Sequence, residues 1–308
     1  MRISIITITY NSAKTLRDTL ESVAYQDYGD IEHIIVDGGS SDDTLAIVQQ
    51  YPHIEKCLVG RDKGIYDALN KGINVATGDY IGILHSDDFY ADDAVISRVV
   101  RHLQRTQTDA LYADLDYVYH YDVNVIVRAW RSGNFDRHKF YFGWMPPHPT
   151  FFLKKAVYEQ LGGYTLELKS AADYELMLRV LFKYDISVSY LPSVIVKMRT
   201  GGMSNRSFQN RIKANLEDRK AWTMNGLEPY FFTSWLKPFS KLRQFVLRYF
   251  FYRLLTWRSR YNQKRGKLLI PEHQLQAFPS KVVFIGDEAA ANQSQNTKNN
   301  NLVSISEA

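Results

Sequence analysis

Cysteine is nearly absent from this sequence, in which Cys57 is the only one among 308 residues. A single cysteine excludes an internal disulfide and any metal site built from several cysteines, so nothing requires an oxidising compartment. Long apolar runs are also missing, since no uncharged stretch reaches the roughly 18 residues of a membrane-spanning helix. The N-terminal residues lack the features of a signal peptide and are expected to form a first strand. We therefore expect a cytoplasmic protein, with attachment to the inner face of the cytoplasmic membrane as a further hypothesis.

A strong charge of one sign is lacking too. The chain has 38 Lys and Arg against 33 Asp and Glu residues, a net charge of +5 and a pI near 9.0. This mild excess falls far short of the basic stripes of nucleic-acid-binding proteins, so we expect no nucleic-acid partner. An anionic small molecule or an acidic membrane surface suits it better. Hydrophobic residues make up 45% of the chain, which is enough for one main domain with appendages.

Three common nucleotide-binding motifs are missing. The expected first strand leads into Tyr10-Asn11-Ser12-Ala13, where a nicotinamide-dependent oxidoreductase needs a glycine-rich turn. No Gly-x-x-x-x-Gly-Lys-Ser/Thr occurs, which disfavours a P-loop nucleotidase. A sugar-phosphate nucleotidylyltransferase normally carries a Gly- and Arg-rich phosphate loop near its N-terminus, and it stays as the nearest enzymatic alternative. Outside the enzymes, the alternative is a non-catalytic carbohydrate-binding protein on the same fold.

The first hundred residues alternate short β-rich runs with helical patterns. We predict strands over residues 3–8, 31–36, 54–59 and 80–84, helices over 13–24 and 65–75, and a short helix that follows the turn at 38–41 and ends near residue 50. This alternation predicts an α/β fold with a mostly parallel sheet and helices on both of its faces. In such sheets ligands bind beyond the carboxyl ends of the strands. The residues that follow each strand are therefore the first place to look for a site.

The alternation weakens after residue 105. We predict a hairpin from strands 111–119 and 125–130, and a stiff proline-rich loop at 145–149 that enters a strand at 150–153. Helices over 155–161 and 171–182 and an extended run over 187–198 follow. We expect one domain over 1–225, divided into halves at 1–105 and 106–225.

The C-terminal part has a different composition. Residues 226–265 are aromatic and basic and favour a helical extension, whereas 266–308 lack the apolar content to order themselves and are expected to be a tail. For residues 235–257 we hypothesise peripheral contact with an anionic membrane surface, where a lipid-linked acceptor would lie. Packing against the main domain or a second subunit is the alternative.

Adjacent acids follow the strand at 80–84. Asp87 and Asp88 repel one another, and a divalent cation would relieve that repulsion, because Mg²⁺ and Mn²⁺ prefer oxygen ligands and bind carboxylates together with substrate phosphates. The alternative is a helix cap. Asp37 closes the second strand and opens a turn with two glycines, which permit close backbone approach to a ligand. Its carboxylate suits hydrogen bonds from a nucleobase or ribose, and an N-cap is again the alternative.

Charged residues also follow the third strand. Arg61 and Lys63 with Asp62 suit contacts to a diphosphate and a ribose, although a solvated turn is the simpler interpretation. On the helix that follows, we expect Asp67 to point toward the site. The run after the first strand, Thr9-Tyr10-Asn11, is expected at the same edge and completes the candidate ligand-binding set.

Two further candidates lie in the second half. Asp173 opens a helical run, and a carboxylate at a helix start facing a cleft can act as general base toward an acceptor hydroxyl. Capping is its alternative role. His148 lies in the proline-rich loop and is a candidate contact to the acceptor or the sugar, although a lone histidine is more often structural.

Five motifs, taken in order, resemble those of glycosyltransferase family 2, and their order and spacing are far more specific than any single motif. They are Thr7-Ile8-Thr9-Tyr10-Asn11, Asp37-Gly38-Gly39-Ser40-Ser41-Asp42-Asp43-Thr44, Asp62-Lys63-Gly64-Ile65-Tyr66-Asp67-Ala68-Leu69-Asn70-Lys71-Gly72, Ala76-Thr77-Gly78-Asp79-Tyr80 and Ser86-Asp87-Asp88. The likeness continues through Pro147-His148-Pro149-Thr150-Phe151-Phe152 and Ser170-Ala171-Ala172-Asp173-Tyr174-Glu175-Leu176, and it covers about the first 220 residues. It is strongest to the bacterial branch that builds surface polysaccharides.

This resemblance implies a GT-A fold with a Rossmann-like, mostly parallel central sheet, in which residues 1–105 are the nucleotide-sugar-binding (donor) half and residues 106–225 the acceptor-binding half. It also implies a divalent metal, Mn²⁺ or Mg²⁺, and transfer of a sugar from a nucleotide diphosphate-sugar to a lipid-linked or polysaccharide acceptor with inversion at the anomeric centre. By the same resemblance Asp37 matches the nucleobase-binding acid, Asp87 the ribose or sugar contact, Asp88 the metal ligand and Asp173 the catalytic base.

Two features depart from the pattern of the family. His85-Ser86 precedes the aspartate pair where many members have an acid or an asparagine. A metal-binding histidine often found downstream has no obvious counterpart near Arg199-Thr200. The metal ligands other than Asp88 are therefore not identified by the sequence.

Overall fold

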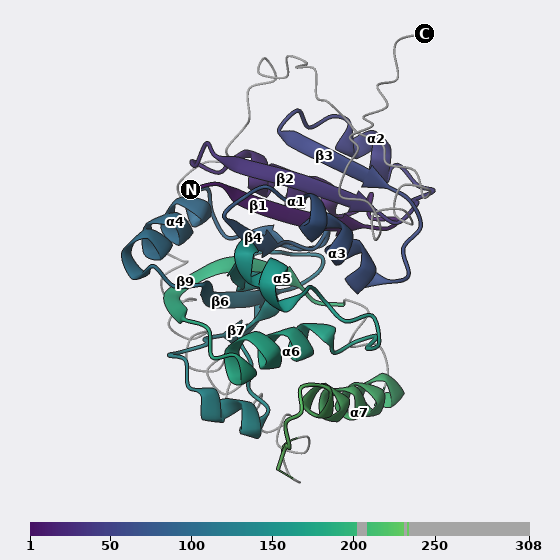
Figure 1. Ribbon diagram of the computed structural model, residues 1–308. Helices are drawn as coiled ribbons and strands as arrows, with labels where there is room; N and C mark the ends of the chain where they lie inside the picture. Colours follow the sequence, from purple (N-terminus) through teal and green to yellow (C-terminus); the bar gives the residue numbers. More distant parts are fainter. Residues whose placement is uncertain (202–207, 231–232, 234–308) are drawn as a thin grey trace, which may run out of the picture.

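The computed structural model describes residues 1–201, 208–230 and 233, and these form a nine-stranded mixed sheet with helices around it (Figure 1). The strands are β1 Ile3–Thr9, β2 Ile31–Asp37, β3 Ile54–Val59, β4 Tyr80–Ile83, β5 Phe89–Tyr90, β6 Ala110–Val118, β7 Ile126–Trp130, β8 Phe152–Lys154 and β9 Val188–Arg199. The helices are α1 Leu16–Ala24, α2 Thr44–Val48, α3 Ile65–Val75, α4 Val95–Thr106, α5 Lys155–Leu161, α6 Ala172–Met177 and α7 Phe208–Met224. The predicted α/β fold is confirmed.

The strand order is β3-β2-β1-β4-β8-β6-β9-β5, with β7 paired to β6. Strands β1 to β4 run parallel, and β8 lies antiparallel between β4 and β6. Because β8 opposes both neighbours, β6 and the parallel strand β9 point in the same direction as β4. The carboxyl ends of β1, β2, β3, β4, β6 and β9 therefore share one edge of the sheet, and the start of β8 lies at that edge too. We call it the carboxyl edge.

Alternation along β2 explains why helices cover both faces. Ile35 packs with α1, α2 and Cys57 on one face, whereas Ile34 and Val36 point the other way and pack with α3. On that second face the helix approaches the sheet very closely, because a Cβ on Gly72 would lie 2.6 Å from Cγ2 of Ile6. Only glycine fits there without a shift of α3.

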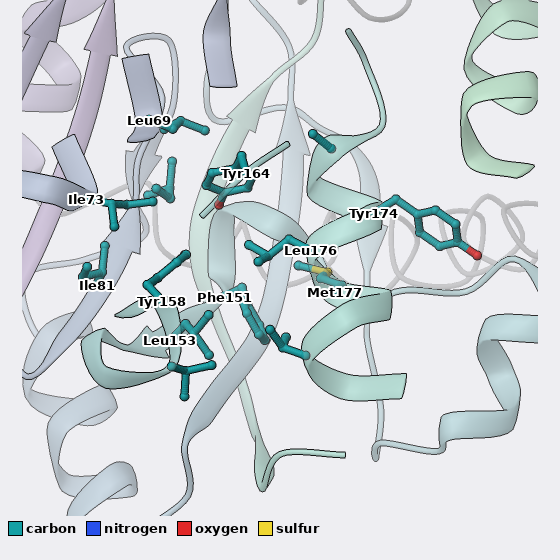
Figure 2. Close-up of a cluster of buried hydrophobic side chains, with 14 of the residues drawn as sticks. Leu69, Ile73, Ile81, Phe151, Leu153, Tyr158, Tyr164, Tyr174, Leu176 and Met177 are labelled. Carbon is teal, nitrogen blue, oxygen red and sulfur yellow. The ribbon is translucent and has the colours of Figure 1, made fainter. Parts of the chain in front are cut away.

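The largest apolar cluster joins the two halves of the domain. Figure 2 shows Leu69 and Ile73 of α3 facing side chains from β8, α5 and α6, including Leu153, Tyr158 and Leu176. A second cluster lies under α4, whose Val99 and Leu103 are fully buried. The predicted halves thus share one core, although their boundary at residue 105 stays a prediction.

Two predicted elements differ most from the observed ones, while several others, such as the helix predicted at 13–24 that begins at Leu16, differ by a few residues at an end. The strand expected at 150–153 begins only at Phe152, since His148–Thr150 forms a 3-10 turn after Pro147. The helix expected at 171–182 is α6 followed by a π-helical segment, Leu178–Lys183. The hairpin of β6 and β7 is confirmed. The predicted extension at 226–265 lies outside the described residues except for 226–230 and 233, and the tail at 266–308 lies wholly outside them.

Candidate functional site

Hydrogen bonds join the loops at the carboxyl edge. Ser12, after β1, contacts Ser86, after β4, with the two hydroxyl oxygens 2.9 Å apart. Thr15 donates to the carbonyl of Ser86 at 2.9 Å. The loop after β2 joins the same assembly, because the Gly38 N–H donates to the Thr9 carbonyl at 2.9 Å. Residues far apart in sequence are therefore held together at one edge.

Asp37 is fully buried at the end of β2. Its Oδ1 accepts hydrogen bonds from the N–H groups of Gly39, at 3.0 Å, and Ser40, at 2.7 Å. Its Oδ2 accepts from the hydroxyls of Thr9, at 2.8 Å, and Ser40, at 2.6 Å. Four donors use the acceptor sites of this carboxylate, so a nucleobase contact would have to replace one of them. The nucleobase role stays a prediction.

Tyr10 and Asn11 lie in the loop after β1, beside the turn that Asp37 opens. Tyr10 is 67% exposed and so is open to a stacking partner. Asn11 has a φ of +50°, and its side-chain oxygen accepts from the Ser41 N–H at 2.9 Å. This hydrogen bond joins the loop after β1 to the loop after β2, so Asn11 stabilises the arrangement of the two loops.

The charged residues after β3 form one network around Lys71 of α3. The Lys71 ammonium donates to Asp62 at 2.6 Å and to the Arg61 carbonyl at 2.9 Å, and it lies 3.7 Å from Asp67. Asp67 also accepts from the Lys63 N–H at 3.0 Å. Burial raises the pKa of Asp62, although the Lys71 hydrogen bond opposes this. The Asp62 and Asp67 side chains and the backbone of Arg61 and Lys63 are thus brought together around Lys71, while the roles of the Arg61 and Lys63 side chains stay predictions.

The turn at residues 85–88 is held from two sides. On one side, Thr19 of α1 donates to the Asp88 carbonyl at 2.7 Å. On the other, Arg199 at the end of β9 donates to the Asp87 carbonyl at 2.7 Å, and its guanidinium also pairs with Asp18 of α1. Arg199 is only 5% exposed, and it lies over the ring of Phe89. The buried guanidinium of Arg199 therefore holds the turn at residues 85–88 in place.

Asp88 is fully buried and incompletely satisfied. Its Oδ1 accepts from the Arg199 N–H at 3.2 Å, whereas Oδ2 has no hydrogen-bond partner among the described residues. Burial and the charge of Asp87 raise the pKa of Asp88 well above its usual range, and Arg199 only partly opposes them. A buried carboxylate oxygen without a donor is unfavourable unless a cation or a proton satisfies it.

This arrangement fits a divalent cation. An orphaned carboxylate oxygen is a hard ligand that Mg²⁺ and Mn²⁺ accept, and these ions take most of their other ligands from water and substrate phosphates. In residues 1–201, 208–230 and 233, no three His, Cys, Asp or Glu side chains are grouped to hold a metal by themselves. Asp88 would therefore hold a cation jointly with a phosphate-bearing ligand.

Asp173, the second residue of α6, faces the donor half. Its Oδ1 accepts a hydrogen bond from the hydroxyl of Tyr66 in α3 at 3.2 Å. Burial lowers the pKa of His85, while the negative charges of Asp87 and Asp173 both act to raise it. The Tyr66 hydrogen bond links the start of α6 to α3.

His148 lies next to His85, with ring centroids 6.0 Å apart. Its Nε2 is 2.7 Å from the hydroxyl of Tyr164, and the residue is 8% exposed. Burial lowers the pKa of His148 to about 3, so the ring is neutral at pH 7. The structure places this candidate at the carboxyl edge, mostly beneath the surface, and a sugar or acceptor contact stays a prediction.

Comparison with known proteins decides the family. A model of "Glycosyl transferase family 2" matches residues 4–163, which is half of the chain. A "PGL/p-HBAD biosynthesis glycosyltransferase" of Mycobacterium bovis is 31% identical over 212 residues, covering 66% of this chain and 78% of that protein. The chain belongs to glycosyltransferase family 2.

Solved structures confirm the fold of this family 2 glycosyltransferase. TarS 1–349 of S. aureus in complex with UDP-GlcNAc has a TM-score of 0.60 at 20% identity, covering 73% of this chain and 65% of that one. The mannosyltransferase PcManGT of Pyrobaculum calidifontis, in complex with GDP-Man and Mn²⁺, has a TM-score of 0.55 at 20% identity, covering 78% and 69%. The chain spans 39% of TarS in another crystal structure. The GT-A fold is confirmed.

Sequence reasoning missed three residues that shape this glycosyltransferase site. Tyr66 stands within a quoted motif, one position before Asp67, and its helical phase turns it toward Asp173. Arg199 follows the predicted extended run, but its contacts with Asp18 and Asp87 depend on the packing of β9. His85 departs from the family pattern, and the sequence does not show that it lies beside His148. A basic residue at the end of an extended run was the one available signal for Arg199.

Proposed function

We propose that this family 2 enzyme transfers a sugar from a nucleotide diphosphate-sugar to an acceptor hydroxyl in one displacement with inversion. The observation that carries the proposal is the fully buried Asp88 at the carboxyl edge, whose Oδ2 has no hydrogen-bond partner among the described residues. An acid near the leaving diphosphate and an acid near the acceptor are what this chemistry needs on one side of the sheet.

The proposed steps use the residues of this chain. Asp173 takes the proton of the acceptor hydroxyl as that oxygen bonds to the anomeric carbon, and the bond from this carbon to the diphosphate breaks as the nucleoside diphosphate leaves. The Tyr66 hydrogen bond orients the Asp173 carboxylate. Asp88 would hold the divalent cation, which supplies positive charge for the departing diphosphate. The proposed nucleotide-sugar-binding set consists of Thr9, Tyr10, Asn11, Asp37, Arg61, Asp62, Lys63, Asp67 and Asp87.

The proposed setting is the synthesis of cell-surface polysaccharide at the inner face of the cytoplasmic membrane. A likeness to chondroitin synthase of Escherichia coli, 39% identical over 97 residues but covering only 14% of that protein, agrees with a polysaccharide acceptor. In the part of the chain that the structure describes, no helix is both long and apolar enough to span a membrane. Peripheral contact through residues 235–257 belongs to this proposal and lies outside the described residues.

The test begins with donor hydrolysis, in which water replaces the acceptor. We expect slow, Mn²⁺- or Mg²⁺-dependent hydrolysis of UDP-GlcNAc or GDP-mannose, the donor types bound by the two structural neighbours. The variant Asp173→Asn should lose about 100-fold or more in turnover, as expected when a general base is removed. Wild-type turnover in a folded Asp173→Asn variant would reject the base assignment. Binding without any hydrolysis by the wild type would favour a non-catalytic carbohydrate-binding protein.

A further inference from the structure

The helix that carries Asp173 has no cap of its own. Its N-cap residue is Ala171, which has no side-chain acceptor for the N–H groups at the start of α6. These groups need acceptors because the first turn of a helix leaves its N–H groups without partners inside the helix. At this end of α6 the acceptors come from other elements.

The Tyr66 oxygen accepts from the Ala172 and Asp173 N–H groups, and Glu217 of α7 accepts from the residues just before the helix. Its Oε2 accepts from the Ser170 N–H at 2.7 Å and from the Ser170 hydroxyl at 2.8 Å, and its Oε1 accepts from the Lys169 N–H at 3.3 Å. Burial raises the pKa of Glu217, but hydrogen bonds from Ser170, Lys169 and Ala171 outweigh this effect and lower it overall. The carboxylate is therefore a charged acceptor at the N-terminal end of α6, where the helix dipole favours a negative charge.

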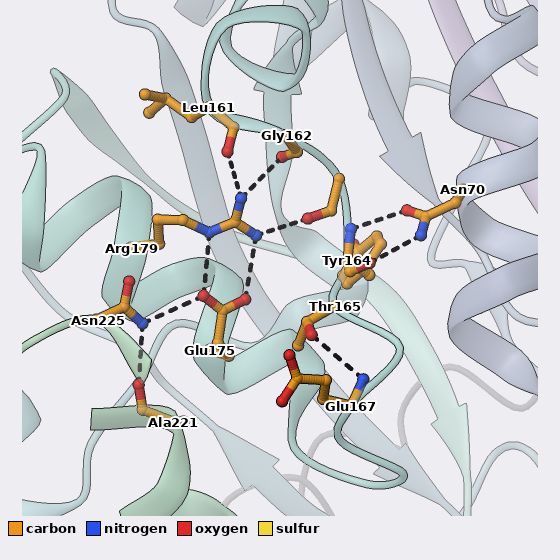
Figure 3. A network of polar contacts seen from close by, with 11 residues as sticks. Asn70, Leu161, Gly162, Tyr164, Thr165, Glu167, Glu175, Arg179, Ala221 and Asn225 are labelled. Carbon is orange, nitrogen blue, oxygen red and sulfur yellow. Dashed lines mark hydrogen bonds and ion pairs between the residues drawn. The ribbon is translucent and has the colours of Figure 1, made fainter. Parts of the chain in front are cut away.

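Two more contacts fix α7 along the same helix. The Trp222 indole N–H donates to the Tyr174 hydroxyl at 2.9 Å, and the Asn225 amide donates to Glu175 at 3.2 Å. Figure 3 shows Asn225 and Glu175 in the network through which Arg179 holds the carbonyls of residues 161–163. Tyr174 and Glu175 directly follow Asp173, so α7 contacts the segments on both sides of the proposed base.

We propose that Glu217 is a positioning residue for the transfer reaction, acting from α7 through residues 169–171 to hold Asp173 in place. The inference rests on the proposed role of Asp173 as base. A displacement of a reacting group by about 1 Å costs about 100-fold in rate, so a loosened α6 start lowers turnover without affecting donor binding. The residues proposed to bind the nucleotide-sugar follow β1, β2 and β3, so they do not depend on the start of α6.

The test compares three variants by hydrogen exchange. In Glu217→Ala, exchange over residues 169–177 should become at least about tenfold faster, while exchange over β1 to β4 stays as in the wild type. Glu217→Gln keeps one acceptor oxygen, so its exchange rate over residues 169–177 should lie between those of the wild type and Glu217→Ala. The matched control is Lys220→Ala on the same helix, whose ammonium pairs with Glu167 at 3.3 Å between exposed side chains. Unchanged exchange over 169–177 in Glu217→Ala would overturn the inference.

Kinetics separate positioning from general loss of structure. With Mn²⁺ and whichever of UDP-GlcNAc and GDP-mannose the wild type hydrolyses, Glu217→Ala should lower kcat about tenfold and leave KM for the donor unchanged. Lys220→Ala should match the wild type. If Glu217→Ala fails to fold, Glu217→Gln becomes the deciding variant and should show a smaller fall in kcat alone.

A double-mutant cycle then shows whether Glu217 acts through Asp173. In the Asp173→Asn background, Glu217→Ala should cause no further loss, because there is no base left to position. The same fractional loss in both backgrounds would overturn the inference. Wild-type turnover in Asp173→Asn alone would instead reject the proposed base, while the hydrogen-exchange comparison still decides whether Glu217 holds the start of α6.

Discussion

Glu32 and Asp88 are both fully buried, but they stand at opposite ends of the parallel strands and have opposite surroundings. Glu32, near the start of β2, accepts from Lys56 at 2.6 Å, from the Ser4 hydroxyl at 2.5 Å and from the Thr77 N–H at 2.7 Å. Asp88, after β4, has an oxygen without a partner among the residues that the structure describes. The buried carboxylate near the start of β2 is thus satisfied by neighbouring groups, whereas the one after β4 is not.

The pKa values of the two carboxyls follow this difference. Burial raises the pKa of both, but at Glu32 the Lys56 ion pair and the hydrogen bonds from Ser4 and Thr77 prevail and lower it to about 2. At Asp88 the neighbouring Asp87 adds to the effect of burial, and the pKa is raised well above its usual range. Glu32 is therefore a carboxylate stabilised by internal partners, while the carboxyl edge retains in Asp88 a carboxylate suited to a bound cation.

The largest expected effect comes from neutralising the unsatisfied carboxyl. Asp88→Asn should reduce donor hydrolysis by about 100- to 1000-fold, or roughly 3 to 4 kcal/mol of transition-state stabilisation. Its melting temperature should stay equal to that of the wild type or rise, because a strained buried charge is removed. Steady-state kinetics and thermal unfolding check both points, with exposed Asp93→Asn as the control. Normal turnover in Asp88→Asn would contradict the assigned role.

Removing the satisfied carboxyl should have the reverse pattern. Glu32→Ala leaves Lys56, Ser4 and Thr77 without their common acceptor and should cost about 3 kcal/mol of unfolding free energy. Chemical denaturation measures this loss. The folded fraction should keep its kcat, since Glu32 lies at the opposite end of the strands from the site. A large fall in kcat with unchanged stability would show that Glu32 serves the site and not the stability of the fold.

Stabilisation by a bound ligand should depend on Asp88 and not on the partners of Glu32. UDP with Mn²⁺ at about 100 times its Kd should stabilise the wild type by about 2.7 kcal/mol, read as a rise in melting temperature. In Asp88→Asn this gain should largely vanish, whereas a Lys56→Met variant, weakened at the other end of the sheet, should keep it. An equal gain in all three proteins would show that the cation does not depend on Asp88.

The smallest expected effect concerns acid stability near the amino end. His53 Nε2 lies 2.9 Å from Nδ1 of His33, and burial lowers the pKa of His53 to about 4. The folded state therefore binds a proton less readily than the unfolded state, so stability is full above about pH 6.5 and falls as the pH drops toward 4. His53→Gln should remove roughly 1 kcal/mol of this pH dependence between pH 6.5 and 5. Urea unfolding at several pH values measures it, and an unchanged slope would contradict it.

Local pattern was enough to predict much of the carboxyl edge. Alternating apolar residues and polar turns specify β1 to β4 and the helices between them, because strand and helix periods are properties of neighbouring residues. Parallel connections then place Asp37, Asp62 and Asp88 at one edge. The order of these motifs was also enough to indicate the family, which the comparisons confirm.

Only the tertiary structure decided which distant groups meet. Tyr66 and Asp173 are 107 positions apart, Ser170 and Glu217 are 47 apart, and Arg199 and Asp18 are 181 apart. Periodicity says which face a side chain occupies but not which element will cover that face. The antiparallel insertion of β8 between β4 and β6 brings His148 to the carboxyl edge, and three residues of strand carry no signal for that pairing. Whether a buried carboxylate is satisfied, as at Glu32, or left open, as at Asp88, depends on those long-range contacts, because the partners come from other strands and helices.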